Sequence, residues 1–300
     1  MKKILKIFAV MVMAAMPLAL LAEDKPLDPG AGVQDFKPKA PKSKSKAQQI
    51  LDQVKQNMDS LDDYQVTIEE NSAVYGPKGK KTANGITKMT VKKDKRYVEQ
   101  ETDRDDVQQK IIQVFDGRRS WAYDQRTKIA RKVEFNNISK ELRDKFKAMM
   151  MKQNINLPEA DYKLSEQAMG GKNYYVLDLM KPFSSGNQVF DKIRITIERS
   201  NEGQGLKDEG RGTSKDNSEV LLVCKQEITA HLIINVPGAK QSFEINTETT
   251  QEFKDWKVNT GIKDYEFTIA LPADVQIIDE TANTRIALEK MMESNLGNKQ

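Results

Sequence analysis

The stretch KIIQVFDGRRSWAYDQRTKIARKV, residues 110–133, contains three short apolar runs separated by two turn signals. The first signal is Asp116-Gly117, a pair that favours the positive φ of a two-residue hairpin turn. The second is the polar stretch 124–128. This spacing predicts a meander of three antiparallel strands. Trp121 and Tyr123 are two residues apart, so they share one face of the predicted sheet, and that bulky apolar face must be covered or filled.

Alternation of apolar and polar residues continues on both sides of this meander and predicts a sheet of many strands. The other expected strands are residues 65–75, 86–93, 95–102, 162–167, 173–179, 190–198, 220–237, 241–253, 256–271 and 275–278. Ile193 and Ile195 alternate with polar residues in one of them, and Phe267 and Ile269 do so in another. Each pair is therefore expected on an apolar face. The connections are short, so consecutive strands are expected to be neighbours in the sheet.

Three helices are expected among these strands. Residues 47–61 carry apolar side chains along one helical stripe. Residues 139–151 place four apolar side chains on one face: Leu142, Phe146, Met149 and Met150. Methionine adapts to variable apolar partners, so this helix fits either a lid over an apolar cavity or an ordinary core helix. Residues 281–300 are expected to form a C-terminal helix and tail. The predicted fold class is α+β with strands dominating.

The N-terminal segment has the pattern of an exported protein. Three lysines precede an uncharged apolar run, which predicts a cleaved secretory signal over residues 1–22. A membrane anchor is the alternative, but a spanning helix needs about 20 apolar residues. Residues 23–46 hold four prolines and few large apolar side chains, so a disordered linker is expected. Residues 200–219 form a polar, glycine-rich insertion that does not match a phosphate-binding loop.

Charge and composition exclude several classes of function. Removing a signal with three lysines and no acid lowers the formal net charge from +4 to +1. A near-neutral surface argues against a nucleic-acid partner, which requires a basic stripe. The chain has one cysteine, Cys224, and one histidine, His231, so an internal disulfide cannot form. We find no zinc ligand set, nucleophile elbow or oriented Cys–His pair, so the sequence predicts neither an enzyme nor a metal or cofactor site.

Two motifs together resemble the periplasmic lipoprotein carriers of the LolA-like superfamily. The first is a DG-x-x-x-W-x-Y-D hairpin, matched by Asp116, Gly117, Trp121, Tyr123 and Asp124. The second is a closing K-V-N-x-G-I-x-D-x-x-F strand, matched by Lys257, Val258, Asn259, Gly261, Ile262, Asp264 and Phe267. The resemblance covers residues 47–279. The order of signal, amphipathic helix, strands and second helix also matches.

This resemblance implies an incomplete antiparallel β-barrel, or half-barrel, over residues 47–280, with helices covering its open mouth and acyl chains in its cavity. The residues expected to line the cavity are Trp121, Tyr123, Ile193, Ile195, Phe267 and Ile269. The expected lid is Leu142, Phe146, Met149 and Met150. The chain departs from the family where an Arg-Pro pair helps to latch the lid, because Lys93-Asp94 occupies that place. The insertion at 200–219 is a second departure.

The function expected from these features is a periplasmic carrier, mostly monomeric, that binds lipoprotein acyl chains or another lipid and delivers them to the outer membrane. Acyl burial is favourable by about 0.8 kcal/mol per CH₂, so binding requires no catalytic group. The expected partners are a lipid or lipoprotein, an inner-membrane release complex and an outer-membrane acceptor. Two alternatives stay open. One is an envelope-stress sensor that shares the half-barrel, and the other is a structural envelope protein whose own side chains fill the cavity.

Overall fold

The computed structural model describes residues 44–77, 79–104, 107–152, 157–185, 188–200, 220–235 and 242–297. Within these ranges, the side chains of residues 137, 145, 148–152, 200, 234–235, 242–243 and 291–297 are not described. The predicted signal, nearly all of the predicted linker and the predicted insertion, apart from its first residue, lie outside the described residues.

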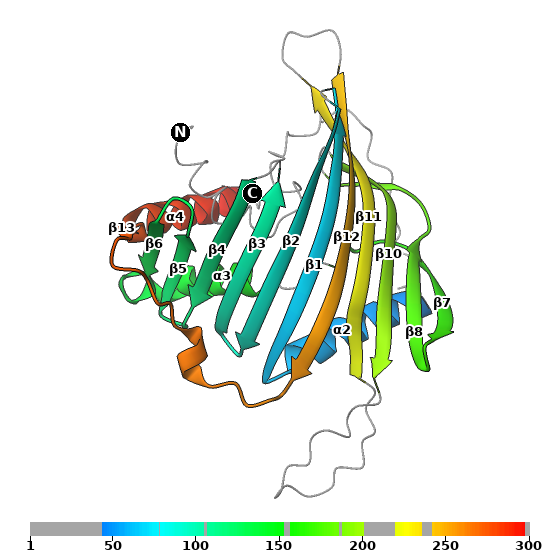
Figure 1. Ribbon diagram of the computed structural model, residues 1–300, viewed down its shortest axis with the longest axis horizontal. Helices are drawn as coiled ribbons and strands as arrows, with labels where there is room; N and C mark the ends of the chain where they lie inside the picture. The colour runs from blue at the N-terminus through cyan, green and yellow to red at the C-terminus, as the bar shows by residue number, and fades with distance from the viewer. Residues whose placement is uncertain are drawn as a thin grey trace, which may run out of the picture.

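One large sheet dominates the fold, as the sequence predicted (Figure 1). Its strands are β1 Asp63–Gly76, β2 Gly79–Lys92, β3 Lys95–Arg104, β4 Val107–Phe115, β5 Arg119–Asp124, β6 Ile129–Glu134, β7 Tyr162–Met169, β8 Lys172–Leu179, β9 Phe183–Ser185, β10 Gln188–Ser200, β11 Val220–Asn235, β12 Ser242–Val258 and β13 Gln276–Asp279. The order is β13-β6-β5-β4-β3-β2-β1-β12-β11-β10-β8-β7, with β9 paired to β10. Neighbours are antiparallel except β13, which runs parallel to β6. The two ends of this order do not pair, so the sheet is open.

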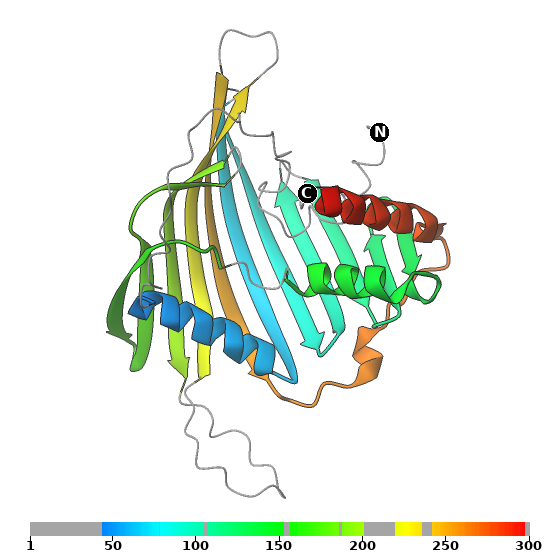
Figure 2. The same ribbon diagram turned by 180° about the vertical axis from the view of Figure 1, so that it is seen from behind.

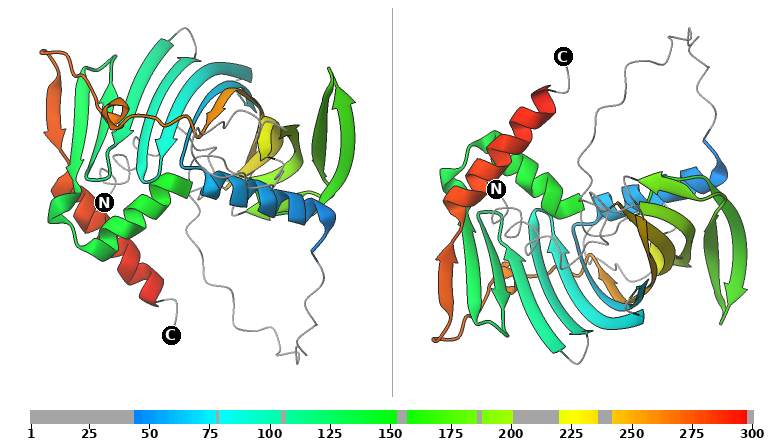
Figure 3. Two further views of the ribbon diagram at one scale, coloured as in Figure 1. Left: turned by 90° about the horizontal axis from the view of Figure 1, so that it is seen from below. Right: turned by 90° about the horizontal axis from the view of Figure 1, so that it is seen from above.

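The sheet is curved, and its helices lie on the concave side (Figures 2 and 3). Helix α2 (Lys46–Ser60) crosses one part of that side. Helices α3 (Lys140–Lys152) and α4 (Thr281–Gly297) cover another part. The three predicted helices are confirmed with small shifts at their ends. The observed class is therefore β-dominated α+β, with few helices beside a large open sheet.

Helix α2 packs on the concave face through one apolar stripe. The Ser45 side chain accepts a hydrogen bond from the Gln48 N–H at 3.1 Å and caps the first turn. The buried residues of this stripe are Ala47, Ile50, Leu51 and Val54. They belong to one cluster, here named the α2 cluster, with the fully buried side chains of Ile193, Ile195 and Ile197 from β10. Burying each large aliphatic side chain contributes about 1.5–3 kcal/mol, which holds α2 against the sheet.

A second apolar cluster, here named the α3 cluster, joins α3 and α4 to strands β4 and β6. Its members are Phe115, Val133, Phe135, Ile138, Leu142, Phe146 and Leu288. The ring centroids of Phe135 and Phe146 lie 4.5 Å apart. Leu288 brings the C-terminal helix α4 into the same cluster, so this helix packs on the body of the protein. The α2 and α3 clusters share no residue, so the two helical regions are held separately.

The strand predicted over residues 256–271 is wrong beyond Val258. Strand β12 ends there, and residues 259–271, here named the strap, pass across the other, convex side and include the short 3₁₀ helix η2 (Asp264–Phe267) (Figure 1). Asn259 and Gly261 have φ values of 52° and 71°, which an extended strand does not allow. A strand continued through this segment would place Tyr265 on the same face as Phe267 and Ile269, but Tyr265 is 72% exposed.

The strap leaves the sheet because a buried carboxylate binds its backbone. Asp63, at the start of β1, accepts the Thr260 N–H through Oδ1 at 2.8 Å. Its Oδ2 accepts the N–H groups of Gly261 at 3.0 Å and Ile262 at 3.1 Å. The Asp63 carbonyl accepts the N–H of Asn259 at 2.8 Å. Four consecutive donors of the second sequence motif are therefore satisfied outside the sheet's hydrogen-bond ladder.

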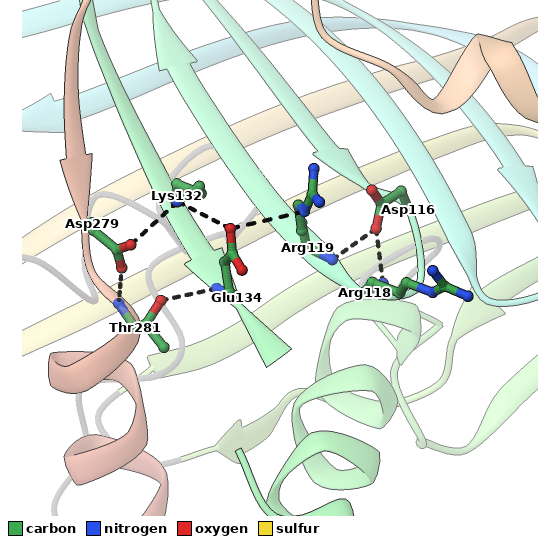
Figure 4. Close-up of polar contacts among 7 residues, drawn as sticks. All are labelled: Asp116, Arg118, Arg119, Lys132, Glu134, Asp279 and Thr281. Atoms are coloured by element: carbon green, nitrogen blue, oxygen red, sulfur yellow. Dashed lines mark hydrogen bonds and ion pairs between the residues drawn. The ribbon is translucent and has the colours of Figure 1, made fainter. Parts of the chain in front are cut away.

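Polar contacts fasten the last strand and helix to the β5–β6 hairpin (Figure 4). Lys132 Nζ lies 3.0 Å from Glu134 Oε1 and 3.3 Å from Asp279 Oδ2, so it links β6 to β13. Thr281 Oγ1 accepts the Glu134 N–H at 2.9 Å, and the Thr281 N–H donates to Asp279 Oδ1 at 3.0 Å. These bonds fix the point where β13 gives way to α4.

The β4–β5 turn is shifted by one residue from its predicted position. Gly117 has a φ of 88°, whereas Asp116 is not among the residues with positive φ. The central residues are therefore Gly117 and Arg118, with glycine in the position that a type II′ turn requires. Asp116 Oδ1 accepts the N–H groups of Arg118 at 2.8 Å and Arg119 at 2.7 Å (Figure 4). Asp116, which precedes the two central residues, thus supports the turn through its side chain.

Candidate functional site

A row of buried residues crosses the concave face, and two of them, Tyr64 and Arg96, carry polar groups. Paired positions on neighbouring strands share a face, and they place Tyr64, Val91, Arg96 and Phe115 side by side on β1 to β4. All four are buried. Val91 belongs to the α2 cluster and Phe115 to the α3 cluster. Arg96 therefore lies at the boundary between the two clusters.

Arg96 has no counter-ion among the described residues. The residue is 4% exposed, and its Nη2 lies 3.9 Å from Met89 Sδ, a weak acceptor. Its Nε and Nη1 have no hydrogen-bond partner in the described part of the chain. Burial lowers the pKa of Arg96, although the nearby Tyr64 acts in the opposite direction. Because arginine stays protonated in proteins, this is a buried, uncompensated positive charge.

One ion pair ties α3 to the sheet close to Arg96. Lys147 Nζ on α3 lies 2.9 Å from Oδ2 of Asp94, which stands in the β2–β3 turn two residues before Arg96. Both side chains are 39% exposed, so the pair contributes about 0–1 kcal/mol. Asp94 is one of the two residues that replace the Arg-Pro latch of the resembled carriers. At this place the structure shows an ion pair with its acid in the β2–β3 turn and its base on α3.

Four of the six predicted cavity residues lie on the convex face or in the strap. Trp121, Phe267 and Ile269 belong to one cluster, which the strap covers. The centre of that cluster includes Val114, whose chain neighbour Phe115 faces the helices, so the cluster lies on the opposite side of the sheet. Tyr123 shares that face by strand parity and is buried. The strap is thus the cover that the bulky face of the meander requires.

The other predicted site residues lie on the concave side. Ile193 and Ile195 are in the α2 cluster, and Leu142 and Phe146 are in the α3 cluster. The side chains of the remaining predicted lid residues, Met149 and Met150, lie outside the described residues. The structure therefore separates the predicted cavity and lid residues into three groups. Contact of any of them with a ligand stays a prediction.

Sequence reasoning missed Arg96 and Asp63 as residues of special interest. For Arg96 a signal existed, because it shares the parity of Val98, a buried residue on the concave face of β3. An arginine at an apolar position of a strand is a local conflict that marks a site. For Asp63 no local signal existed, because its partners at residues 260–262 are distant in the sequence.

A hollow of about 310 Å³ lies on the convex side of the sheet, over β7, β8, β10 and β11. Its lining is mixed polar and apolar: Gln167, Met169, Tyr174, Val176, Arg194, Thr196, Cys224, Lys225 and Glu227. Arg194 is already occupied, since it forms a two-pronged contact with Asp178 at 2.6 and 3.1 Å. This hollow is distinct from the Arg96 position.

Cys224 and His231 cannot form a nucleophilic pair. They lie seven residues apart on the extended strand β11, which separates them by roughly 23 Å at about 3.3 Å per residue. His231 Nδ1 instead lies 2.7 Å from Asp191 Oδ2. The Cys224 thiol donates to the carbonyl of Thr196 at 3.3 Å. Burial raises the pKa of Cys224 to about 11.

We expect the Cys224 thiol to react slowly with Ellman's reagent at pH 8 in the folded protein. With a pKa of about 11, only about 0.1% of the thiol is thiolate at that pH, since each pH unit below the pKa lowers the fraction tenfold. Complete reaction in a denaturant is the control. Reaction of the folded protein at the rate of a free thiol would show that Cys224 is not protected.

Among the described residues, no group of three or more His, Cys, Asp or Glu side chains is arranged to hold a metal ion. Helices α2, α3 and α4, as far as they are described, lack the apolar length of a membrane-spanning helix.

Comparison with known proteins gives only distant likenesses. No protein-family model matches the chain, and no curated protein matches it. Among solved structures, an uncharacterized conserved protein from Thermus thermophilus is 14% identical, with a TM-score of 0.39, over 78% of this chain and 99% of that one.

Two other solved structures have more specific descriptions. An outer membrane lipoprotein-sorting protein domain from Vibrio parahaemolyticus is 11% identical, with a TM-score of 0.26, over 73% of this chain and 95% of that one. LprF from Mycobacterium bovis is 9% identical, with a TM-score of 0.28, over 76% and 97%. Likenesses this low support no conclusion about what this chain binds.

Proposed function

We propose that this protein is a periplasmic carrier that binds the acyl chains of lipoproteins, or of another lipid, and delivers them to the outer membrane. The supporting observation is the open, curved sheet whose apolar concave face is covered by two separately packed helical regions (Figure 3). Acyl burial contributes about 0.8 kcal/mol per CH₂. A surface of this kind therefore binds without a catalytic group, and the proposal is of a non-enzyme.

In this proposal the sheet is a half-barrel and α2 and α3 cover its mouth. Because the two clusters share no residue, α3 can leave the sheet without unpacking α2. When an acyl chain enters beside α3, the contacts that the sheet makes with Phe146 and its neighbours are replaced by contacts with the acyl chain. Return of α3 then shields the bound chain from water.

The cellular setting is part of the same proposal. The predicted signal at 1–22 supports export to the periplasm. A carrier in that compartment requires a membrane donor that releases the lipid-bearing cargo and an acceptor at the outer membrane. The chain itself is proposed to act mostly as a monomer.

The proposal is tested by purifying the protein from a bacterial envelope fraction, extracting it with organic solvent and identifying the extract by mass spectrometry. We expect an acyl-bearing molecule in amounts comparable to the protein. Absence of lipid, together with failure to bind an apolar dye, would contradict the carrier and favour the structural alternative. Co-purification of a membrane-anchored regulator in place of lipid would favour the sensor.

Replacing Asp94 with Asn is expected to speed uptake of an apolar dye by about 1.4- to fivefold, because exposed ion pairs such as the one with Lys147 that holds α3 contribute about 0.2–1 kcal/mol. Stopped-flow fluorescence measures the rate. Lys147→Gln should give the same increase, and the double variant should add nothing further.

The matched control for this prediction is Asp274→Asn. This substitution removes an exposed ion pair with Lys128 that lies beyond the strap and away from α3. It should leave the uptake rate unchanged. Equal uptake rates in the wild type and the Asp94 variant would show that this contact does not limit the movement of α3.

A further inference from the structure

We propose that Arg96 binds the oxyanion head of an amphiphilic ligand, a phosphate or carboxylate group, while the acyl chain of the ligand lies along the apolar concave face. This inference rests on the proposed function, because it names the chemical class of lipid that the carrier takes. It also assigns a role to a residue outside both sequence motifs.

The first argument is the uncompensated charge. Arg96 is 4% exposed, and its Nε and Nη1 have no partner among the described residues. The hydrogen-bond contact that it makes in the described part of the chain, Nη2 to Met89 Sδ at 3.9 Å, is weak. Taking a charged group out of water is strongly unfavourable unless another charge and hydrogen bonds compensate it. A buried group with unmet donors therefore calls for a partner that the described residues do not supply.

The second argument is the chemistry of the missing partner. A guanidinium is a planar array of N–H donors that matches the oxygens of a phosphate or carboxylate. An oxyanion satisfies both the positive charge and the free N–H groups. A hydrocarbon, a sterol or an uncharged ester would leave the positive charge of Arg96 without a counter-ion.

The third argument separates an amphiphile from a small soluble anion. The flanking residues on the row are Val91 and Phe115, and Met89 and Val98 lie one step further along β2 and β3. All four are buried and apolar. A free anion at this position would gain one cation, Arg96, but it would lose its hydration water and lie against apolar side chains. A lipid presents its head to Arg96 and its chain to those neighbours, so it matches both.

Access to Arg96 follows from its position at the edge of α3. Phe115, its neighbour on β4, packs on Phe146 of α3 with ring centroids 6.3 Å apart. Asp94, two residues away, carries the ion pair with Lys147 of the same helix. Movement of α3 therefore opens a path to the guanidinium, and its return covers the bound head group.

The test compares two ligands of equal chain length, dodecyl phosphate and dodecanol, by calorimetric titration below their aggregation limits. We expect the wild-type protein to bind dodecyl phosphate about 10- to 100-fold more tightly, as expected for hydrogen bonds to a charged group. Arg96→Met should reduce this preference to about onefold while dodecanol still binds. Arg96→Lys should keep part of the preference, and the exposed Arg118→Met should keep all of it.

The outcomes distinguish the two proposals. If the wild type binds neither ligand, the carrier function fails and this inference fails with it. If both ligands bind equally and Arg96→Met changes nothing, the carrier stands and the head-group role of Arg96 is overturned. If inorganic phosphate alone binds Arg96 as tightly as dodecyl phosphate does, the site takes a free anion and the amphiphile is excluded. A thermal melt of each variant confirms that it is folded.

Discussion

Replacing Asp63 with Asn lowers the free energy of unfolding by an expected 2–4 kcal/mol, about the cost of leaving buried donors of this kind without a charged acceptor. The carboxylate accepts backbone N–H groups of Thr260, Gly261 and Ile262. An asparagine side chain has one oxygen, and its NH₂ group must face at least one of these donors. The strap then loses the bonds that fix it to β1.

Urea unfolding followed by tryptophan fluorescence measures this loss. Trp121 packs in the cluster that the strap covers, so its emission also reports release of the strap before global unfolding. The matched control is Asp62→Asn at the preceding, exposed position, where a change within about 0.5 kcal/mol is expected. Equal unfolding midpoints for the two variants would show that the carboxylate does not anchor the strap.

Replacing Arg96 with Met acts in the opposite direction and raises the free energy of unfolding of the ligand-free protein by an expected 1–4 kcal/mol, about the range found when buried charges give way to apolar side chains. Methionine fills an irregular apolar gap well, and it would meet Met89, Val91 and Phe115. The substitution removes a desolvated charge and leaves no donor unmet.

The same unfolding measurement serves for this prediction, with the exposed Arg118→Met as control and an expected change within about 0.5 kcal/mol. A large loss of stability in the Arg96 variant would show that the folded protein already compensates this charge. Gain of stability together with loss of the phosphate preference is the joint signature of a residue kept for binding.

Much of the fold could be predicted because it follows from local patterns. The alternation around Ile193 and Ile195 and the helical stripe of Leu51 and Val54 each specify one buried face, and both faces are buried in the α2 cluster. Turn residues marked the hairpin ends to within one position, as at Gly117.

The strap could not be predicted because its conformation is set by a distant residue. Phe267 and Ile269 alternate as they would in a strand, but Asp63 binds the preceding backbone and turns it away from the sheet. Nor could the sequence show that the predicted cavity residues are divided between the two faces of the sheet. Strand parity puts Trp121 and Tyr123 on one face, yet it does not say whether helices or the strap will cover that face.

The strap also distinguishes the strands that it crosses from the rest of the sheet. It follows the end of β12 and runs along one end of strands β1 to β5 (Figure 1). Asp63 of β1 and Lys92 of β2 bind its backbone, and Tyr97, Val114 and Trp121 of β3 to β5 belong to the cluster that it covers. The opposite wing, β11-β10-β8-β7, is instead crossed on its concave side by α2, which contacts β11 and β7. The two parts of the sheet are therefore held from opposite faces. Because β7 stands at the end of the strand order, we expect its amide hydrogens to exchange with solvent deuterium sooner than those of β2 and β3.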